Sequence, residues 1–219
     1  MWKGMEDLTV SSASLKTLTI KLGYFVSTLS IDTPNLLHFN YFGCVASDYP
    51  LVTMGNLVDA QINLLTKAQL AYQRKYYNGW FDVQVAIGYS NVWKLFHGIR
   101  NVPHLDLFPD TFEVISMCSE SLPVFNNLKS LAIWSGEDRG WQAMPALLRN
   151  CPNLETLVIK ILKTMYVTDK CGDVCDSIYR EHKGLSLTLC PVKVMKIHGF
   201  QGTMKEMAMI EHFWSIFHR

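Results

Sequence analysis

Two nearly identical stretches, Asn127-Leu-Lys-Ser-Leu-Ala-Ile133 and Asn153-Leu-Glu-Thr-Leu-Val-Ile159, decide the fold of this chain. Successive residues of a strand point to opposite faces, so Leu131 and Ile133 lie on one face and Ala132 on the other. A single unit of this kind leaves its apolar face uncovered. Neighbouring units must therefore stack and share one core.

The same strand-like phrase returns along the whole chain. The other instances are residues 14–20, 35–41, 56–62, 104–107 and 192–197. The first leucine of the phrase recurs at positions 15, 36, 57, 105, 128 and 154, in steps of 21, 21, 48, 23 and 26 residues. Leucine-rich repeats are about 20–29 residues long, so the steps predict such repeats. The step of 48 has room for one degenerate unit around residues 83–87.

Between these strands, the chain is expected to return through helices or irregular turns. Residues 141–149 and 91–99 carry apolar side chains at helical spacing, and Pro152 stops the first of these helices. Residues 64–77 are helical by propensity and end in a polar run typical of an exposed excursion. The alternative is an ordinary α/β domain whose strands resemble one another by accident.

Composition narrows the class of protein. Hydrophobic residues make up 49% of the chain and charged residues 18%, a balance that suits a continuous core. The formal net charge of +1 gives no long-range attraction for nucleic acid. No apolar run approaches the roughly 18 residues of a membrane span, and the start lacks a secretory signal. We therefore expect neither a nucleic-acid nor a membrane partner, mostly reduced cysteines, and a cytoplasmic or nuclear location.

The chain resembles the plant F-box, FBD and leucine-rich-repeat proteins, most specifically in its second half. The similarity is carried by residues 122–131, 138–145, 147–157, 167–176 and 190–207. With the repeats, it predicts an α/β fold: a leucine-rich-repeat-like solenoid over 1–160, with parallel strands and intervening helices or loops. A polar insertion loop over 161–185 and a truncated FBD-like strand-helix unit over 186–219 complete the expected organisation, and the last unit caps the solenoid.

The resemblance also implies a function. Proteins of this family generally carry an N-terminal F-box that docks on a Skp1-type adaptor of an SCF ubiquitin ligase, and their repeats hold the substrate. This implies a non-enzymatic protein-interaction module of the substrate-recognition type. Strand-like residues begin at Leu8, so we expect no F-box ahead of them and no binding of this chain to a Skp1-type adaptor. The alternatives are a free-standing interaction or structural protein without a ligase role and, third, a hydrolase or metalloenzyme.

One candidate site emerges from the sequence, in the segment that follows the strand at 127–133. Strand-to-helix loops of repeat proteins often present contacts, so this segment is expected to face a partner. Its candidate residues are Trp134, Glu137, Asp138, Arg139 and Trp141. The alternative is a turn with structural tryptophans.

Metal and catalytic sites are not predicted. Cysteine and histidine are zinc's preferred ligands, but Cys171, Cys175, His182 and Cys190 are irregularly spaced and form no paired-cysteine knuckle. The acidic residues at 169, 173 and 176 lack the glycine and terminal glutamate of a calcium loop. We therefore expect no cofactor, and an insertion without a tightly held metal.

The C-terminal segment predicts an amphipathic helix. Thr203-Met-Lys-Glu206 matches a capping box, and the helix is expected over residues 204–217. Its apolar stripe comprises Met207, Met209, Ile210, Phe213, Trp214, Ile216 and Phe217. We expect this stripe to cover the last repeat rather than a membrane surface, because the polar face lacks a lysine and arginine cluster.

Overall fold

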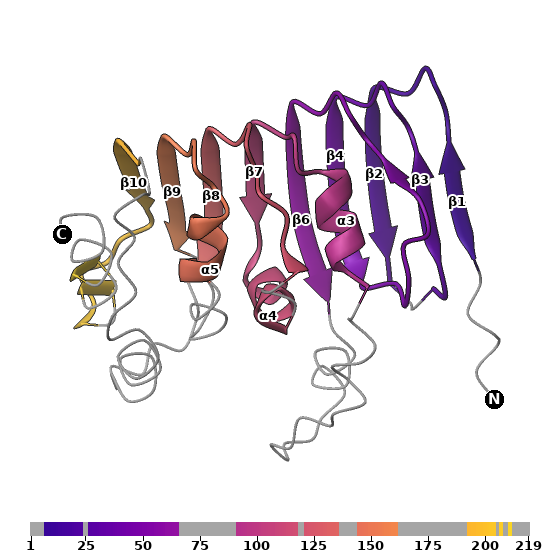
Figure 1. Cartoon of the computed structure of the whole chain (residues 1–219). Coiled ribbons are helices and arrows are strands. Elements are labelled where there is room, and N and C mark those ends of the chain that lie inside the picture. The colour runs from indigo at the N-terminus through magenta and orange to yellow at the C-terminus, as the bar shows by residue number, and fades with distance from the viewer. Residues whose placement is uncertain are drawn as a thin grey trace, which may run out of the picture.

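The fold is built on one large parallel sheet (Figure 1). The computed structural model describes residues 7–23, 26–65, 91–117, 121–135, 144–161, 192–204, 206–207 and 210–211. The sheet has seven strands in the order β10-β9-β8-β7-β6-β4-β2. Their bounds are β2 (Thr17–Leu22), β4 (His38–Cys44), β6 (Asp59–Leu65), β7 (His104–Leu107), β8 (Ser130–Ser135), β9 (Thr156–Ile161) and β10 (Val194–His198).

Each of the seven repeated phrases contributes one strand to this sheet, which confirms the strand predictions. The units also join in the same way. Where β4 begins, the N–H groups of Leu37 and His38 both donate to the carbonyl oxygen of Lys16, at 2.9 and 3.0 Å. Equivalent pairs of N–H groups open β6, β8, β9 and β10. The arrangement is compatible with a leucine-rich-repeat-like fold.

The asparagine that introduces several phrases has a structural role. Its side-chain amide donates to a backbone carbonyl of the preceding unit, just before the equivalent position there. These bonds join Asn35 to Ala13 (2.9 Å), Asn56 to Pro34 (3.0 Å) and Asn153 to Asn126 (2.8 Å). Each one ties the turn before a strand to the previous turn.

The core lies against one face of the large sheet. The inward positions of the strands are filled by large apolar side chains, including Phe39, Tyr41, Ile62, Leu105, Leu107, Leu131, Ile133, Leu157 and Ile159. Leu131 and Ile133 are 0% and 1% exposed, as predicted. Ala132 is also buried but is not part of this cluster, in keeping with its place on the opposite face. Burying each leucine-sized side chain contributes roughly 1.5–3 kcal/mol.

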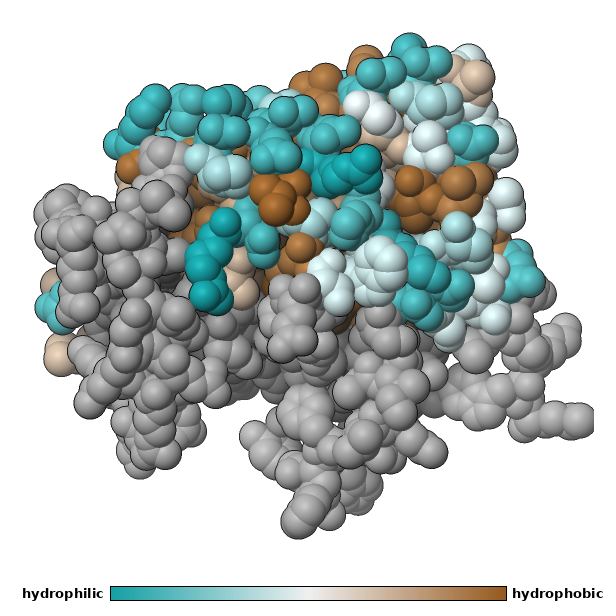
Figure 2. Space-filling model, in the orientation of Figure 1, coloured by the Kyte–Doolittle hydropathy of each residue, from teal (hydrophilic) through white to brown (hydrophobic). Residues whose placement is uncertain are grey.

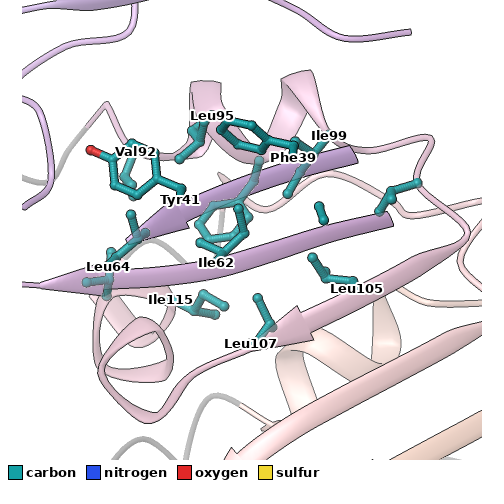
Figure 3. Packing of buried hydrophobic residues seen from close by; sticks show 14 of the residues in the cluster. Phe39, Tyr41, Ile62, Leu64, Val92, Leu95, Ile99, Leu105, Leu107 and Ile115 are labelled. Atoms are coloured by element: carbon teal, nitrogen blue, oxygen red, sulfur yellow. The ribbon is translucent and has the colours of Figure 1, made fainter. Parts of the chain in front are cut away.

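A second layer covers this core. Helices α3 (Trp93–Gly98) and α5 (Met144–Arg149) lie across the sheet in Figure 1. Figure 3 shows Leu95 and Ile99 of the α3 segment beside Phe39. The helix predictions at 91–99 and 141–149 are confirmed over Trp93–Gly98 and Met144–Arg149, and residues 141–143 lie outside the described residues.

Strands also contribute to this layer. β1 (Leu8–Ser11), β3 (Leu29–Asp32) and β5 (Val52–Thr53) make a separate three-stranded parallel sheet in the order β1-β3-β5. Leu29 and Ile31 are both 0% exposed and belong to the core cluster. Strand β1 coincides with the strand-like residues expected from Leu8. The sequence did not predict β3 and β5, which occupy returns expected to be helical or irregular.

Two predictions are wrong in part. Strand β6 pairs directly with β7, with Asp59 opposite His104, so no further repeat strand separates the two and the degenerate unit has no place there. Residues 83–87 themselves lie outside the described residues. The helix expected over 64–77 fails at its start, because Leu64 and Leu65 continue β6 opposite Gly43 and Cys44. Sheet pairing outweighs helix propensity here.

Helix α4 (Pro109–Met117) begins just after β7, and one of its side chains makes hydrogen bonds to the backbone of the neighbouring strand β6. Strand β7 ends at Leu107, opposite Ile62, although β6 runs on to Leu65. The hydroxyl of Thr111, which is 0% exposed, donates to the carbonyl of Ile62 at 2.9 Å and accepts from the N–H of Leu64 at 3.0 Å. The Thr111 side chain thus makes the hydrogen bonds to β6 that the backbone of a longer β7 would make.

At the C-terminus, the predicted capping box is confirmed. The N–H of Glu206 donates to the Thr203 hydroxyl at 3.3 Å, and the N–H of Thr203 donates to the Glu206 carboxylate at 2.8 Å. Ile210 packs against the core, but Met207 is 43% exposed and does not join the expected buried stripe. The remaining stripe residues lie outside the described residues. Ile161, the first residue of the predicted insertion, is the last residue of β9, and residues 162–185 lie outside the described residues.

Candidate functional site

The face of the large sheet that points away from the core is the candidate site, and we call it the open face. Its side chains form three rows across the strands. The amino-end row is Thr17, His38, Asp59, His104, Ser130, Thr156 and Val194. The middle row is Thr19, Asn40, Gln61, Asp106, Ala132, Val158 and Lys196. The carboxyl-end row is Lys21, Phe42, Asn63, Phe108, Trp134, Lys160 and His198, with Phe108 directly after β7.

The carboxyl-end row holds a group of touching aromatic rings. Phe108 and Trp134 are stacked, with ring centroids 5.1 Å apart and an interplanar angle of 6°. Phe42 meets Phe108 edge-on at 5.5 Å, and the ammonium group of Lys160 lies 4.6 Å from the Trp134 ring centroid. Such ring pairs contribute about 0.5–1.5 kcal/mol each beyond burial of area. The rings therefore hold one another in place on a surface that faces away from the core.

Two polar atoms of this row, Oδ1 of Asn63 and Nε1 of Trp134, are buried and have no hydrogen-bond partner in the described part of the chain. Asn63 occupies the strand between those of Phe42 and Phe108, and adjacent strands are about 4.8 Å apart. The contact between the two phenylalanine rings therefore crosses over Asn63. A buried polar atom without a partner costs about 1–3 kcal/mol, so this row holds hydrogen-bonding capacity that the fold does not use.

Charges on the open face are partly neutralised within it. Asp106 binds Lys160 at 2.9 Å, and Asp59 contacts Nδ1 of His38 at 2.5 Å. Two lysines of the face, at positions 21 and 196, are exposed and form no ion pair with any described residue. Both carboxylates of the three rows thus have a partner, and three lysines against two carboxylates leave a positive charge on the face.

Two further ion pairs connect neighbouring units. Lys129 binds Glu155 at 2.9 Å beside the amino ends of β8 and β9, and this hydrogen bond lowers the pKa of the Glu155 carboxyl. Lys94 of α3 binds Asp48 at 2.7 Å and lowers the pKa of that carboxyl in the same way. Each is a carboxylate beside a lysine, without a nucleophile, and we assign them a structural role.

The opposite side of the molecule looks different. Figure 2, in the orientation of Figure 1, shows the helix-covered side. Its coloured part is mainly hydrophilic, with hydrophobic residues in separate patches. Contiguous apolar or aromatic surface is the usual mark of an interaction site. The half-buried rings of Phe42, Phe108 and Trp134 on the open face contact one another, so they form one connected group.

The structure locates one residue of the predicted partner-facing segment. Trp134 belongs to β8 and lies on the open face, whereas Glu137, Asp138, Arg139 and Trp141 lie outside the described residues. Sequence reasoning missed the residues that surround Trp134, namely Phe42, Asp106, Phe108 and Lys160. The available signal was their position one residue away from core residues in each phrase, but only the register shows which of them are neighbours.

No other chemistry gathers within the described part of the chain. The cysteine, histidine and acidic residues weighed as metal ligands, between 169 and 190, all lie outside it. Inside it, no group of three or more His, Cys, Asp or Glu residues is placed to hold a metal ion. Among the same residues, no helix is long and apolar enough to cross a bilayer.

Parallel strands in chain order, a leucine-based core and an open face define a class of α/β protein compatible with leucine-rich-repeat proteins. Curated relatives agree with this class. The chain is 54% identical to an F-box/LRR-repeat protein of Arabidopsis thaliana over 212 residues, covering 96% of this chain and 45% of the relative. An F-box protein and a second F-box/LRR-repeat protein of the same plant are 55% and 53% identical, each over 97% of this chain.

The chain therefore belongs to the plant F-box/leucine-rich-repeat proteins, which confirms the resemblance in the sequence. It spans about half the length of the curated relatives that it matches, between 44% and 45% of the three described above. No protein-family model and no solved structure matches the chain.

Proposed function

We propose that this chain is a protein-interaction module whose open face binds a partner protein. The observation that carries the proposal is the contrast between the two faces of the large sheet. One face is filled by the core, and the other presents stacked aromatic rings and lysines that form no ion pair with a described residue. Interaction sites are enriched in Trp, Tyr, Phe and Arg, and an aromatic group on rigid strands suits that role.

We further propose the setting of this interaction. The relatives are named F-box and F-box/LRR-repeat proteins, which supports substrate recognition for a ubiquitin ligase, without catalysis by this chain. In this proposal, residues 1–160 form a leucine-rich-repeat-like solenoid, residues 161–185 an insertion, and residues 186–219 an FBD-like unit. The chain acts in the cytoplasm or nucleus. A Skp1-type adaptor joins only through an F-box upstream.

The second candidate is a free-standing interaction protein without a ligase role. It has the same open face, but binding of the partner does not lead to ubiquitination of that partner. The two candidates are separated by the adaptor, so one experiment addresses both.

The experiment places a photo-crosslinking amino acid on each side of the molecule. One variant carries benzoylphenylalanine at Gln61, in the middle row of the open face, and the control carries it at the exposed Arg100 after α3. Both are made as the chain alone and as a fusion behind an F-box, then irradiated in plant extract. We expect protein adducts from position 61 in both forms, and co-purified Skp1-type adaptor with the fusion only.

Each outcome has a defined meaning. Equal or stronger adducts from position 100 contradict the open face as the binding surface. Adducts from position 61 that are never ubiquitinated by the reconstituted fusion complex favour the free-standing candidate. Adaptor binding by the chain alone contradicts the proposal that an F-box is required.

A further inference from the structure

The carboxyl-end row differs from the other two rows in having an apolar middle and basic ends. Phe42, Phe108 and Trp134 occupy its centre, and no carboxylate belongs to this row. Lys21 stands at the β2 end. The β9–β10 end has Lys160 and His198, with Lys196 of the middle row beside them. A ligand that follows this row therefore meets positive charge, then rings, then positive charge.

We propose that the carboxyl-end row binds a short, extended, acidic peptide segment with apolar residues at its centre and carboxylates near both ends. This rests on the proposed function, since the segment belongs to the partner protein. Five strand spacings of about 4.8 Å separate β2 from β9, or roughly 24 Å. An extended chain advances about 3.3 Å per residue, so about seven residues span the distance.

The charges of the face support an acidic occupant. Asp106 and Asp59 are held by Lys160 and His38, whereas Lys21 and Lys196 have no ion partner among the described residues. A basic peptide would meet Lys21 at one end and Lys196 at the other, and like charges repel. Carboxylates at the peptide's ends would complement both positions, which contributes specificity and association rate.

The orphan polar atoms support a peptide. Trp134 has a buried indole N–H without an acceptor, and Asn63 has a buried amide oxygen without a donor. They are two strands apart, roughly 10 Å. A peptide main chain carries both missing partners, C=O and N–H, at every residue. Because this N–H is buried, a peptide carbonyl can reach it only if the Trp134 ring moves, so binding should change the indole environment.

A single-stranded nucleic acid is the other ligand that uses rings and lysines, but the geometry disfavours it. Bases need free ring faces, and the faces of Phe108 and Trp134 are already stacked together, with Lys160 over the indole. Such strands also require a continuous basic groove, whereas Asp106 and Asp59 lie on the same face.

The test uses fluorescein-labelled synthetic peptides and the full chain. The acidic probe is Asp-Glu-Leu-Phe-Leu-Glu-Asp. Its matched controls are Lys-Lys-Leu-Phe-Leu-Lys-Lys, which reverses the charge, and Asp-Glu-Ser-Ser-Ser-Glu-Asp, which removes the apolar centre. A seven-nucleotide oligothymidine is the fourth probe. We expect the acidic apolar peptide to bind at least tenfold more tightly than each of the others, to weaken with salt, and to shift the tryptophan fluorescence of the chain.

Variants assign the binding to the row. The exposed lysines allow a charge test without disturbing the core, so Lys21→Glu with Lys196→Glu should weaken the acidic probe at least tenfold. Trp134→Ala should do the same and abolish the fluorescence shift on binding. Arg100→Glu reverses a charge on the other side of the molecule and should leave affinity unchanged.

The proposal is overturned if the lysine peptide or the oligonucleotide binds as tightly, if Arg100→Glu weakens binding as much as the lysine reversals, or if no peptide binds. These outcomes are separable from failure of the proposed function. Partner adducts from position 61 without peptide binding reject only the acidic-segment assignment, whereas loss of both rejects the open face as a binding surface.

Discussion

The two faces of the large sheet are made by the same strands, yet they carry different kinds of side chain. In β9, Leu157 and Ile159 are both 0% exposed against the core, while Val158 and Lys160, one residue along, face away from it. The core face tolerates only apolar side chains of suitable volume, whereas the open face varies from threonine to tryptophan. Residues that fill the core and residues that face away from it therefore alternate along one phrase.

The largest expected difference is between adjacent residues of β9. Leu157→Ala leaves a cavity in a close-packed interior and should lower the free energy of unfolding by about 2–5 kcal/mol. Val158→Ala, on the open face, should change it by less than about 1 kcal/mol. Urea unfolding of both variants measures the difference. Equal losses would show that the open face is also core, and the comparison would fail.

A smaller loss is expected where a side chain completes the sheet. Thr111→Val keeps the shape of the side chain but removes the hydroxyl that accepts from the N–H of Leu64. That buried N–H then lacks a partner, and we expect a loss of about 1–3 kcal/mol in unfolding free energy. Thr111→Ser, which keeps the hydroxyl, is the matched control. If valine is tolerated as well as serine, α4 does not replace the strand backbone.

The buried tyrosines give the core face a pH dependence. Burial raises the pKa of Tyr49 to about 12 from 10.0, and its hydroxyl accepts from the N–H of Ala46 at 3.1 Å. Below pH 10 the phenol is neutral in both folded and unfolded chains. Between pH 10 and about 12, only the unfolded chain ionises, so the contribution of this group to stability is lost as pH rises.

Tyr49→Phe should flatten this dependence. The variant loses one hydrogen bond at neutral pH, but the gap to the parent chain should narrow by about 1–2 kcal/mol between pH 10 and 12. Chemical unfolding at pH 8, 10 and 11.5 measures it. A gap that stays constant would mean that Tyr49 ionises normally and is not enclosed by the core.

The smallest expected effect lies at the turns that precede the strands. Asn153→Ala removes the bond to the Asn126 carbonyl, and we expect a loss of about 0.5–1.5 kcal/mol in unfolding free energy. Asn127→Ala is the control, because the structure gives the Asn127 side chain no hydrogen bond to a described residue. Equal effects of the two substitutions would show that the asparagine side-chain bonds between successive turns do not stabilise the stacking of units.

The strands of the large sheet could be predicted because each phrase alternates core and surface residues over four to seven positions. The second layer, which covers the core, could be predicted only in part. The number of residues between two strands decides whether the connecting segment is a strand or a helix. Residues 23–37 give 15 positions between β2 and β4, and residues 136–155 give 20 between β8 and β9. An extended chain advances about 3.3 Å per residue against 1.5 Å for a helix. The shorter return therefore crosses the sheet as strand β3, and the longer one accommodates helix α5.

The candidate site was less predictable than the fold. Trp134 was identified because tryptophan is conspicuous after a strand, but Phe42 and Phe108 lie 92 and 26 positions before it. Only the pairing of β4, β6, β7 and β8 in register brings the three rings together. The direct pairing of β6 with β7 was not visible either, since a step of 48 residues is consistent with an extra repeat or with an excursion.

The most direct test of binding by the open face is to change this face alone and to measure the affinity for a partner protein. The partner is one identified by crosslinking from position 61. Val158→Arg places a long charged side chain in the middle row without entering the core. We predict at least a tenfold loss of affinity in a purified binding assay, with an unfolding free energy within about 1 kcal/mol of the parent chain. Unchanged affinity in a folded Val158→Arg chain would contradict the claim that this face binds the partner.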